Sequence, residues 1–388
     1  MIPHRGRILI VANTSWHVLN FRMPLIKELQ AHGVTVTAAA PLDECSKSLE
    51  AQGVHHIELP IGRKTLNPLS DLLLTIRLYR LYHRERPDVV FHNTIKPVIY
   101  GSMAAHWAGV GRVLNMIPGL GYVFSGNQLS QRLLRPLVKQ MYRHAMRNTD
   151  AVLFQNPDDR DYFVKSGLVK AGKSQVTYGS GVDLDHFYYV DHTPSNHCTF
   201  LLLGRMLWDK GVGEYVEAAR RVRKRHPSTR FLLLGIIDPD NPSFIPEHVI
   251  NEWNKNGDIE FLASTADVRG ILEKADVVVL PSYYREGVPK SLLEAAAMGK
   301  PVITTDMPGC REAVVNNLTG LLIPARNVDA LTEAMSALAA DPARRLGMGR
   351  EGRKLASERF DVKRVNQEIL VAMGIANEGQ QELSTGKG

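Results

Sequence analysis

Two glutamates eight residues apart, Glu286 and Glu294, form the pair in this chain whose spacing most directly points to chemistry. They lie in residues 282–300, after the apolar run Val277–Leu280, and Gly299 can end a helix there. The stretch is therefore predicted to fold as strand, loop and short helix. Glu286 then lies in the loop and Glu294 in the first turns of the helix. Backbone N–H groups at the helix start, between the two carboxylates, attract an anion.

The spacing alone leaves two interpretations of this pair open. In the first, a sugar nucleotide binds with its phosphates at the amides of residues 287–291 and a polyol at each carboxylate. In the second, an ordinary strand-to-helix connection carries solvated glutamates, and a lone pair favours that reading. The full string EGVPKSLLEAAAMGKPVITTD resembles the signature of glycosyltransferase family 4, retaining enzymes of the GT-B fold. This resemblance favours the first interpretation.

The resemblance covers nearly the whole chain and implies an α/β fold class. In the GT-B fold, two Rossmann-like, doubly wound parallel-sheet domains face a central cleft. Residues 1–190 would form an N-terminal domain that faces the acceptor and the membrane, and residues 191–360 a donor domain. A helix in residues 361–376 would return to the first domain. The alternation of apolar runs with helical patterns also predicts parallel sheets, whose ligands lie beyond the carboxyl ends of the strands.

Two cations, Arg205 and Lys210, follow the apolar run at residues 200–204. Cations at a strand end can stabilise the charge that develops on a departing nucleoside diphosphate, although such residues are more often ordinary surface residues. The string GRMLWDKGVGEYVEAA resembles the family's diphosphate-binding segment, which assigns that role to both. The resemblance implies catalytic roles for Glu286, Arg205 and Lys210, and donor binding by Gly204, Arg205, Lys210, Glu286, Gly287, Val288, Pro289 and Glu294.

Candidates for binding the acceptor or its phosphate follow predicted strands of the first half. For Arg22, binding of a phosphate or acceptor hydroxyl and an ordinary place in a solvated helix turn are both open. For Lys96, contact with an anion and the cap of a buried strand are both open. The stretch FRMPLIKEL resembles family members that act on polyprenyl-diphosphate-linked sugars. The first loop lacks the paired glycines of many relatives, and Pro118 replaces a family histidine, so no catalytic histidine is carried over. The candidates are His17, Arg22, Lys96, Gly119 and Gly121.

Basic residues are concentrated in the first half of the chain. Residues 1–190 hold 22 Lys and Arg against 14 Asp and Glu, a net charge of +8, within a whole-chain net charge of +7. In residues 131–148, four basic residues recur every four positions along one side of a predicted helix. A solvated face and docking to an anionic membrane are both open, and a second strip at Arg77, Arg80 and Arg84 favours the membrane. The four membrane candidates are Arg135, Lys139, Arg143 and Arg147.

Composition and motifs argue against several other classes. With 44% hydrophobic and 22% charged residues, the chain is typical of globular proteins. Three scattered cysteines without a CxxC pair disfavour a disulfide framework and a zinc cluster. Asp238 and Asp240 are interspersed with prolines, which predicts a turn and not a metal site. No nucleic-acid recognition motif accompanies the basic residues, and no segment reaches the length of a membrane span.

The resemblance implies a retaining transferase that moves an N-acetylhexosamine-type sugar from a UDP-sugar to an undecaprenyl-diphosphate-linked saccharide. Such a step belongs to surface polysaccharide or glycan assembly. The predicted partners are the UDP-sugar, the lipid-linked acceptor and an anionic membrane surface, with no metal or other cofactor. The expected location is cytoplasmic, peripheral at the cytoplasmic face of the inner membrane. A non-hydrolysing UDP-sugar epimerase and a catalytically silent sugar-nucleotide-binding protein at the membrane remain alternatives.

Overall fold

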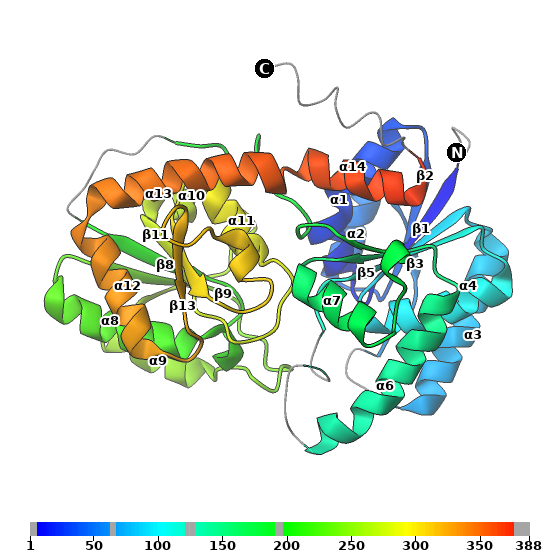
Figure 1. The fold of residues 1–388 in the computed structure, drawn as a ribbon, viewed down its shortest axis with the longest axis horizontal. Coiled ribbons are helices and arrows are strands. Elements are labelled where there is room, and N and C mark those ends of the chain that lie inside the picture. Colours follow the sequence, from blue (N-terminus) through cyan, green and yellow to red (C-terminus); the bar gives the residue numbers. More distant parts are fainter. Residues whose placement is uncertain (1–5, 63–66, 121–123, 125–128, 191–196, 376–388) are drawn as a thin grey trace. The chain divides into compact units, whose positions relative to one another are not determined.

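The computed structural model of the chain describes residues 6–62, 67–120, 124, 129–190 and 197–375 (Figure 1). It divides into two compact units. The first ends at Ser180 and resumes at Lys363, and the second runs from Gly181 to Val362. The division lies before residue 181, earlier than the boundary expected after residue 190.

Residues 181–190 belong to the second unit because they are bound to it. Val182 forms a parallel bridge with Asp361, and the Phe187 carbonyl accepts a hydrogen bond of 2.8 Å from Arg353. The ring of Tyr189 packs where Gly299 has no side chain. These contacts, which join residues more than a hundred positions apart, cannot be read from local composition.

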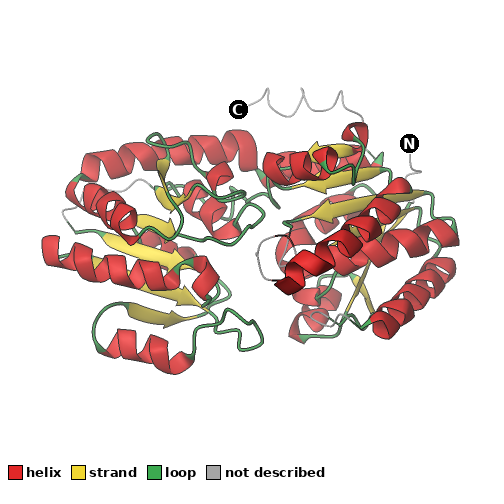
Figure 2. Ribbon diagram, turned by 60° about the horizontal axis from the view of Figure 1, so that its bottom comes forward, coloured by secondary structure: helices red, strands yellow, loops and turns green. Residues whose placement is uncertain are grey.

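The first unit is built on a parallel sheet with strand order β3-β2-β1-β4-β5-β6-β7, and helices cover both of its faces (Figure 2). Its strands are short apolar runs; in β1, for example, every residue after Arg7 is buried. The strands are β1 (Arg7–Val11), β2 (Thr35–Ala40), β3 (His55–Glu58), β4 (Val89–Asn93), β5 (Arg112–Ile117), β6 (Ala151–Phe154) and β7 (Ser174–Val176). The helices are α1 (Ser15–Ala31), α2 (Glu44–Ala51), α3 (Pro68–Glu85), α4 (Ser102–Ala108), α6 (Leu129–Arg147), α7 (Pro157–Lys165) and α14 (Val362–Met373), with a π-helical turn at Pro97–Gly101.

Helix α14 returns to the first unit after the chain has passed through the second. Its apolar residues Val365, Ile369 and Leu370 are buried in the same cluster as Ile26 and Leu29 of α1. Arg112 also donates a hydrogen bond of 3.0 Å to the carbonyl of Ala372, near the end of the helix. The helix thus completes one layer of the first unit.

The second unit has a parallel sheet with strand order β10-β9-β8-β11-β12-β13, again with helices on both faces. The strands are β8 (Thr199–Leu203), β9 (Arg230–Gly235), β10 (Glu260–Ala263), β11 (Val277–Leu280), β12 (Val302–Thr305) and β13 (Gly320–Ile323). The helices are α8 (Val212–Arg225), α9 (Glu247–Lys255), α10 (Arg269–Lys274), α11 (Lys290–Ala297), α12 (Val328–Ala340) and α13 (Pro342–Leu355), with 3₁₀ turns at Trp208–Lys210 and Arg311–Ala313 and a π-helical turn at Ala356–Phe360.

Both sheets confirm the predicted doubly wound α/β class. In each, the strand order reverses beside the first strand of the unit, between β1 and β4 and between β8 and β11. At such a switch point the loops at the carboxyl ends of the strands diverge and leave room for a ligand. The candidate donor residues follow β8 and β11, and several acceptor candidates follow β1 and β4.

Candidate functional site

Two loops meet at the switch point of the second sheet. Residues 204–210 follow β8, and residues 281–289 follow β11. The backbone N–H groups of Tyr283 and Tyr284 both donate to the carbonyl of Asp209, at 3.0 and 3.2 Å. Gly211, with a φ of 74°, lets the first loop approach this closely, since a side chain there would collide with the Pro281 carbonyl. The two loops therefore form one structural element.

Glu286 is held at this meeting point by both of its carboxylate oxygens. The hydroxyl of Ser282 donates to Oε1 at 2.6 Å, and Lys210 Nζ contacts Oε2. The Lys210 and Glu286 side chains are only 13% and 12% exposed, so they form a nearly buried ion pair. The predicted acid and the predicted base of the site are thus direct partners, a contact that the sequence did not predict.

The backbone of the loop that carries Glu286 is closely packed. Gly309, with a φ of 83°, lies against the carbonyls of Glu286 and Gly287, where a side chain would collide with both. The hydroxyl of Thr305 donates to the Ser282 carbonyl. These contacts fix the loop at the end of the sheet, so the Glu286 carboxylate is held in a defined position.

Helix α11 begins as the sequence predicted and carries Glu294 in its second turn. It spans Lys290–Ala297, its N-cap is Pro289 without a side-chain cap, and Gly299 with a φ of 71° follows its end. Its N-terminus therefore has no capping side chain of its own and presents backbone donors. Glu294 is 7% exposed, and burial raises the pKa of its carboxyl group, partly offset by Lys290 Nζ at 3.5 Å.

Replacing Glu294 by glutamine is expected to leave the melting temperature of the free protein unchanged or higher at neutral pH. The raised pKa means that the folded state holds this proton more tightly than the unfolded state, so stability through this group falls as pH rises above its ordinary value of 4.5. The variant lacks this loss, and its advantage over the native protein should vanish below that pH. Thermal denaturation between pH 4 and 8 measures it, with exposed Glu247→Gln as control; a lower melting temperature at neutral pH would contradict the assignment.

Arg205 lies in the first of the two joined loops, on their solvent-exposed side. Its side chain is 45% exposed, and its Nη1 lies 3.3 Å from Oδ2 of Asp238. Gly204 precedes it with no described atom within 4 Å of where a side chain would start, so packing does not require glycine there. Space for close backbone approach is therefore present beside Arg205.

Sequence reasoning overlooked two residues of this site. Asp238 was assigned only to a turn, which the hydrogen bond from Asn241 N–H to its carbonyl confirms, but its side chain is also the ion-pair partner of Arg205. Tyr284 lies near Glu286 and Arg205; burial, then the Glu286 charge, raise the pKa of its phenol, which keeps its proton. Within the described part of the chain, no group of three or more His, Cys, Asp or Glu could hold a metal ion.

In the first unit, Arg22 is buried and not solvated. It is 1% exposed, donates from Nε to Oδ1 of Asn93 at 2.7 Å, and lies 5.3 Å from the ring centre of Phe91. Burial lowers the pKa of Arg22 to about 10. The alternative of a solvated first turn is therefore wrong, and the guanidinium also presents no exposed face to a phosphate.

His17 lies in the first turn of α1, whose N-cap Thr14 accepts its backbone N–H at 3.0 Å. Its ring nitrogen Nε2 is buried without a hydrogen-bond partner among the described residues, as is Nη2 of Arg22. Burial, and then the Arg22 charge, lower the pKa of His17 to about 3, so the ring is neutral. Within α1, Arg22 is thus part of the interior, whereas His17 is half-buried with its Nε2 covered, and the role of both in acceptor binding stays a prediction.

Lys96 has a carboxylate partner in the structure. Its Nζ lies 2.7 Å from Oδ1 of Asp71, and Tyr100 donates to the other oxygen of Asp71 at 2.7 Å. The two charged side chains are 16% and 11% exposed, so the lysine charge is largely offset within the first unit. Of the two interpretations left open for Lys96, this contact favours a role within the fold, and its part in binding the acceptor stays a prediction. Gly119 follows β5 and is half-buried, and Gly121 lies outside the described residues.

The basic stripe of α6 is also more internal than its periodicity suggested. Lys139 lies 5.0 Å from the ring centre of Tyr162, and Arg143 bonds to the carbonyls of Ser166 and Gly167 beyond the end of α7. Two of the four basic residues thus have partners within the first unit. Arg135 is half-buried and Arg147 is exposed.

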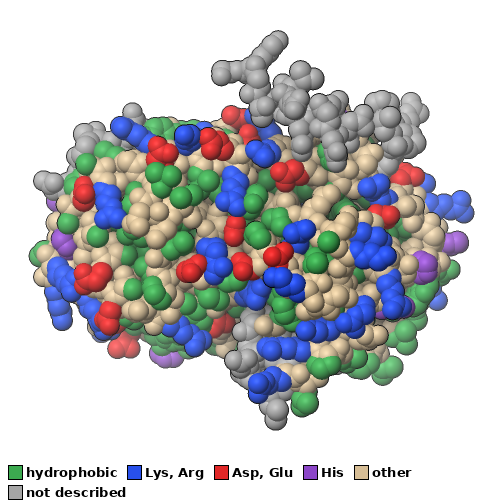
Figure 3. All heavy atoms as spheres, viewed as in Figure 1, with side chains coloured by type: hydrophobic (Ala, Val, Ile, Leu, Met, Phe, Trp, Pro, Cys, Tyr) green, Lys and Arg blue, Asp and Glu red, His purple; other side chains and the backbone are tan. Residues whose placement is uncertain are grey.

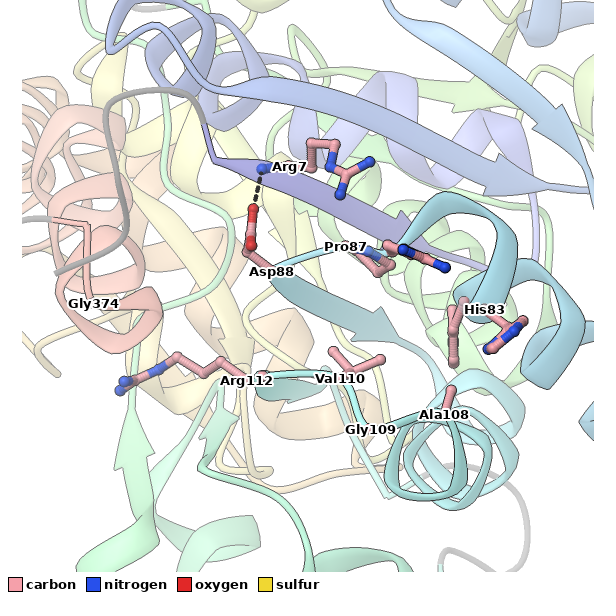
Figure 4. Close-up of a pocket in the computed structure, with 12 residues that line it drawn as sticks. Arg7, His83, Pro87, Asp88, Ala108, Gly109, Val110, Arg112 and Gly374 are labelled. Carbon is pink, nitrogen blue, oxygen red and sulfur yellow. Dashed lines mark hydrogen bonds between the residues drawn. The ribbon is translucent and has the colours of Figure 1, made fainter.

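The first unit has a cavity of about 730 Å³ at the amino ends of β1, β4 and β5, whereas the acceptor candidates follow the carboxyl ends of these strands (Figure 4). Arg7, Arg86 and Arg112 line it together with Asp88. Helices α3 and α4 end there at Arg86 and Gly109, and Arg112 caps α14. Cations at helix carboxyl ends offset the helix dipoles, which accounts for Arg86 and Arg112. Since parallel sheets bind ligands at the opposite ends of their strands, we assign the functional site elsewhere.

Comparison with known proteins matches the two units separately. Residues 197–341 match the family described as glycosyl transferases group 1, and residues 7–156 the one described as glycosyl transferase 4-like. N,N'-diacetylbacillosaminyl-diphospho-undecaprenol alpha-1,3-N-acetylgalactosaminyltransferase of Campylobacter jejuni is 28% identical over 94% of this chain and 97% of its own. UDP-Gal:alpha-D-GlcNAc-diphosphoundecaprenol alpha-1,3-galactosyltransferase of Escherichia coli is 25% identical over 71% and 73%.

Solved structures of glycosyltransferases share the fold of the whole chain. Anabaena HepE in complex with UDP and glucose superposes with a TM-score of 0.78 over 96% of this chain and 100% of its own, at 18% identity. A glycosyltransferase from Rickettsia africae superposes with a TM-score of 0.77 over 96% and 99%, at 21% identity. At such identities the likeness concerns the fold alone.

Proposed function

Since the chain belongs to glycosyltransferase family 4 and is a nucleotide-sugar-dependent enzyme of the GT-B fold, we propose that it transfers a sugar from UDP to a polyprenyl-diphosphate-linked saccharide. The names of two relatives carry this proposal. Both act on undecaprenyl-diphosphate-linked sugars, and one transfers N-acetylgalactosamine. The proposed donor sugar is therefore of the N-acetylhexosamine type, and the proposed acceptor is linked to undecaprenyl diphosphate. Neither relative is named as an epimerase, so that alternative gains no support.

The donor is proposed to bind at the two joined loops of the second unit. Arg205 and Lys210 would bind the diphosphate together with the N-terminus of α11, where Gly287 and Val288 offer backbone N–H groups and Pro289, which has none, is the N-cap of the helix. Glu286 would accept hydrogen bonds from sugar hydroxyls, and Glu294 from the ribose diol. The single observation that supports this proposal most is the direct contact of Lys210 with Glu286, because a cation suited to phosphate then lies beside a carboxylate suited to sugar hydroxyls.

The proposed reaction retains the anomeric configuration. The bond from the sugar's anomeric carbon to the phosphate oxygen breaks, and its electron pair leaves with UDP. The acceptor hydroxyl attacks the same face of the sugar and passes its proton to the departing phosphate oxygen. Arg205 and Lys210 would stabilise the charge on UDP as it develops, and no metal ion is proposed to be needed.

The function is tested with the purified full chain and synthetic polyprenyl-diphosphate saccharides. A panel of UDP-sugars is offered with and without acceptor, and the product linkage is determined by NMR. We expect transfer with an axial linkage from one UDP-N-acetylhexosamine, unchanged by EDTA. A changed nucleotide sugar without acceptor would instead indicate an epimerase, and the absence of transfer from every donor would overturn the proposal.

A membrane-facing surface on the first unit is proposed because the acceptor is anchored in a bilayer. Helix α3 exposes apolar residues beside Arg77, Arg80 and Arg84, and Leu133 and Leu137 of α6 are exposed as well. Lys and Arg side chains gather around α6 in Figure 3, with hydrophobic side chains among them. Basic residues interleaved with apolar ones suit an anionic bilayer surface. No helix of the described residues is long and apolar enough to cross a membrane. The exposed apolar residues of α3 are Leu69, Leu72, Leu73, Ile76 and Tyr79.

Reversing Arg77, Arg80 and Arg84 to glutamate is expected to release the protein from phosphatidylglycerol vesicles at low salt. Each basic residue near such a surface contributes about 1 kcal/mol, so the triple change should lower the partition coefficient by about 10²-fold or more. Sedimentation with vesicles measures it. Reversing Lys224, Lys255 and Lys274 of the second unit changes the net charge equally and is the matched control. Equal sedimentation of both variants would refute this surface.

A further inference from the structure

The half-buried carboxylate of Asp238 lies beside Arg205, where its negative charge opposes the diphosphate binding proposed for that residue. Its Oδ2 is 3.3 Å from Arg205 Nη1, and the two side chains are 26% and 45% exposed. An arginine that binds a diphosphate has to turn its guanidinium toward two phosphate groups. In the structure that guanidinium has an anionic partner, Asp238.

The backbone fixes Asp238 beside Arg205. After β9, the chain from residue 236 runs back along the Arg205 loop, where Met206 N–H donates to the Ile236 carbonyl and Ile245 N–H to the Met206 carbonyl, both at 2.9 Å. Leu207 forms an antiparallel bridge with Phe244. These bonds hold both ends of the segment that contains Asp238.

Further contacts join Ser243, near the end of this segment, to the residues just before Lys210. The N–H of Trp208 donates to the Ser243 carbonyl at 2.8 Å, and the N–H of Asp209 donates to the Ser243 hydroxyl at 3.1 Å. Asp238 itself starts a turn closed by the N–H of Asn241 at 2.9 Å. With the backbone held on both sides, Asp238 stays beside Arg205, and only its side chain can turn when a ligand binds.

We propose that Asp238 competes with the donor diphosphate for Arg205 and so weakens the binding of both UDP-sugar and the product UDP. The inference rests on the proposed diphosphate role of Arg205. When nucleotide binds, Arg205 exchanges a carboxylate for phosphate oxygens, and Asp238 loses its partner next to a second anion. Both changes reduce the binding free energy that Arg205 contributes, and they favour release of UDP after each transfer.

Asp238→Asn is therefore expected to tighten UDP binding by about 3- to 10-fold, the range for an exposed ion pair and one nearby like charge. The KM for the UDP-sugar should fall by a similar factor without a rise in kcat, and inhibition by UDP should strengthen. The difference from the native protein should shrink in 0.5 M KCl, because salt screens exposed charges. A change of fold alone would not produce tighter binding.

The matched control is Asp240→Asn, which removes the same charge from an exposed residue of the same turn. Calorimetric titration with UDP is carried out on the native chain, Asp238→Asn, Asp240→Asn, Arg205→Ala and the double variant Asp238→Asn/Arg205→Ala. Among the single variants we expect tightening only in Asp238→Asn. With Arg205 absent, Asp238→Asn should tighten binding much less, because only the repulsion between Asp238 and the diphosphate is then removed. Equal effects of both aspartate variants, or no effect of Asp238→Asn, would overturn the inference. Unchanged UDP affinity in Arg205→Ala would instead overturn the proposed diphosphate site.

Discussion

Replacing Glu286 by glutamine is expected to lower kcat by about 10²- to 10³-fold, the loss typical for a group that stabilises charge in a transition state. Glutamine keeps the size of the side chain and can still accept from Ser282, but it removes the negative charge that pairs with Lys210. The sugar then loses a charged acceptor for its hydroxyls as positive charge develops on its ring. Initial rates with saturating donor and acceptor measure the effect.

The control for this prediction separates catalysis from folding. Glu247→Gln makes the same change at an exposed position of α9 and should leave kcat unchanged. Glu286→Gln leaves the nearly buried Lys210 without its anion, so its melting temperature should fall, but the fold should persist because the loop around residue 286 is held by backbone contacts at Asp209 and Gly309. Near-native turnover in a folded Glu286→Gln protein would remove the role assigned to this carboxylate.

Replacing both Arg205 and Lys210 by alanine is expected to weaken UDP binding by about 10²-fold or more. A hydrogen bond to a charged group contributes about 1.5–3 kcal/mol, and each side chain is proposed to make at least one to the diphosphate. Isothermal titration of UDP into the folded variants measures the change. Uridine, which lacks the diphosphate, should bind the native and variant proteins alike.

The single variants should differ in a second property. Lys210→Ala leaves the nearly buried Glu286 carboxylate without its cation, so this variant should also lose thermal stability, whereas half-exposed Arg205 should not matter for stability. Arg230→Ala removes another exposed, paired arginine of the same unit and is the control. UDP affinity equal to that of the native protein in the double variant would refute the diphosphate site.

Local sequence patterns predicted the elements of this protein well because those patterns act over a few residues. The strand, loop and helix of residues 277–300 are confirmed, including the start of α11 at Lys290 and the left-handed Gly299 after it. The parallel sheets are confirmed too. They were predictable because buried strands appear in the sequence as short apolar runs and crossover helices as apolar residues at helical spacing. The positions of Arg205 and Lys210 after β8 follow from the same pattern.

Partners far apart in the chain were not predictable. Lys96 meets Asp71, 25 residues earlier, and Arg205 meets Asp238, 33 residues later. Periodicity placed Lys139 and Arg143 on one side of α6, but it could not tell that this side packs on α7. In each case a cation whose partner the sequence could not name has one within the fold. Only the tertiary structure decides between these outcomes.

A crystal structure of the full chain with UDP tests the central claim most directly. We expect the diphosphate against Arg205, Lys210 and the N-terminus of α11, the ribose hydroxyls at Glu294, and the Lys210 ammonium within hydrogen-bonding distance of a phosphate oxygen. UDP bound at any other place, or a nucleotide at this place with Arg205 and Glu294 turned away from it, would contradict the account.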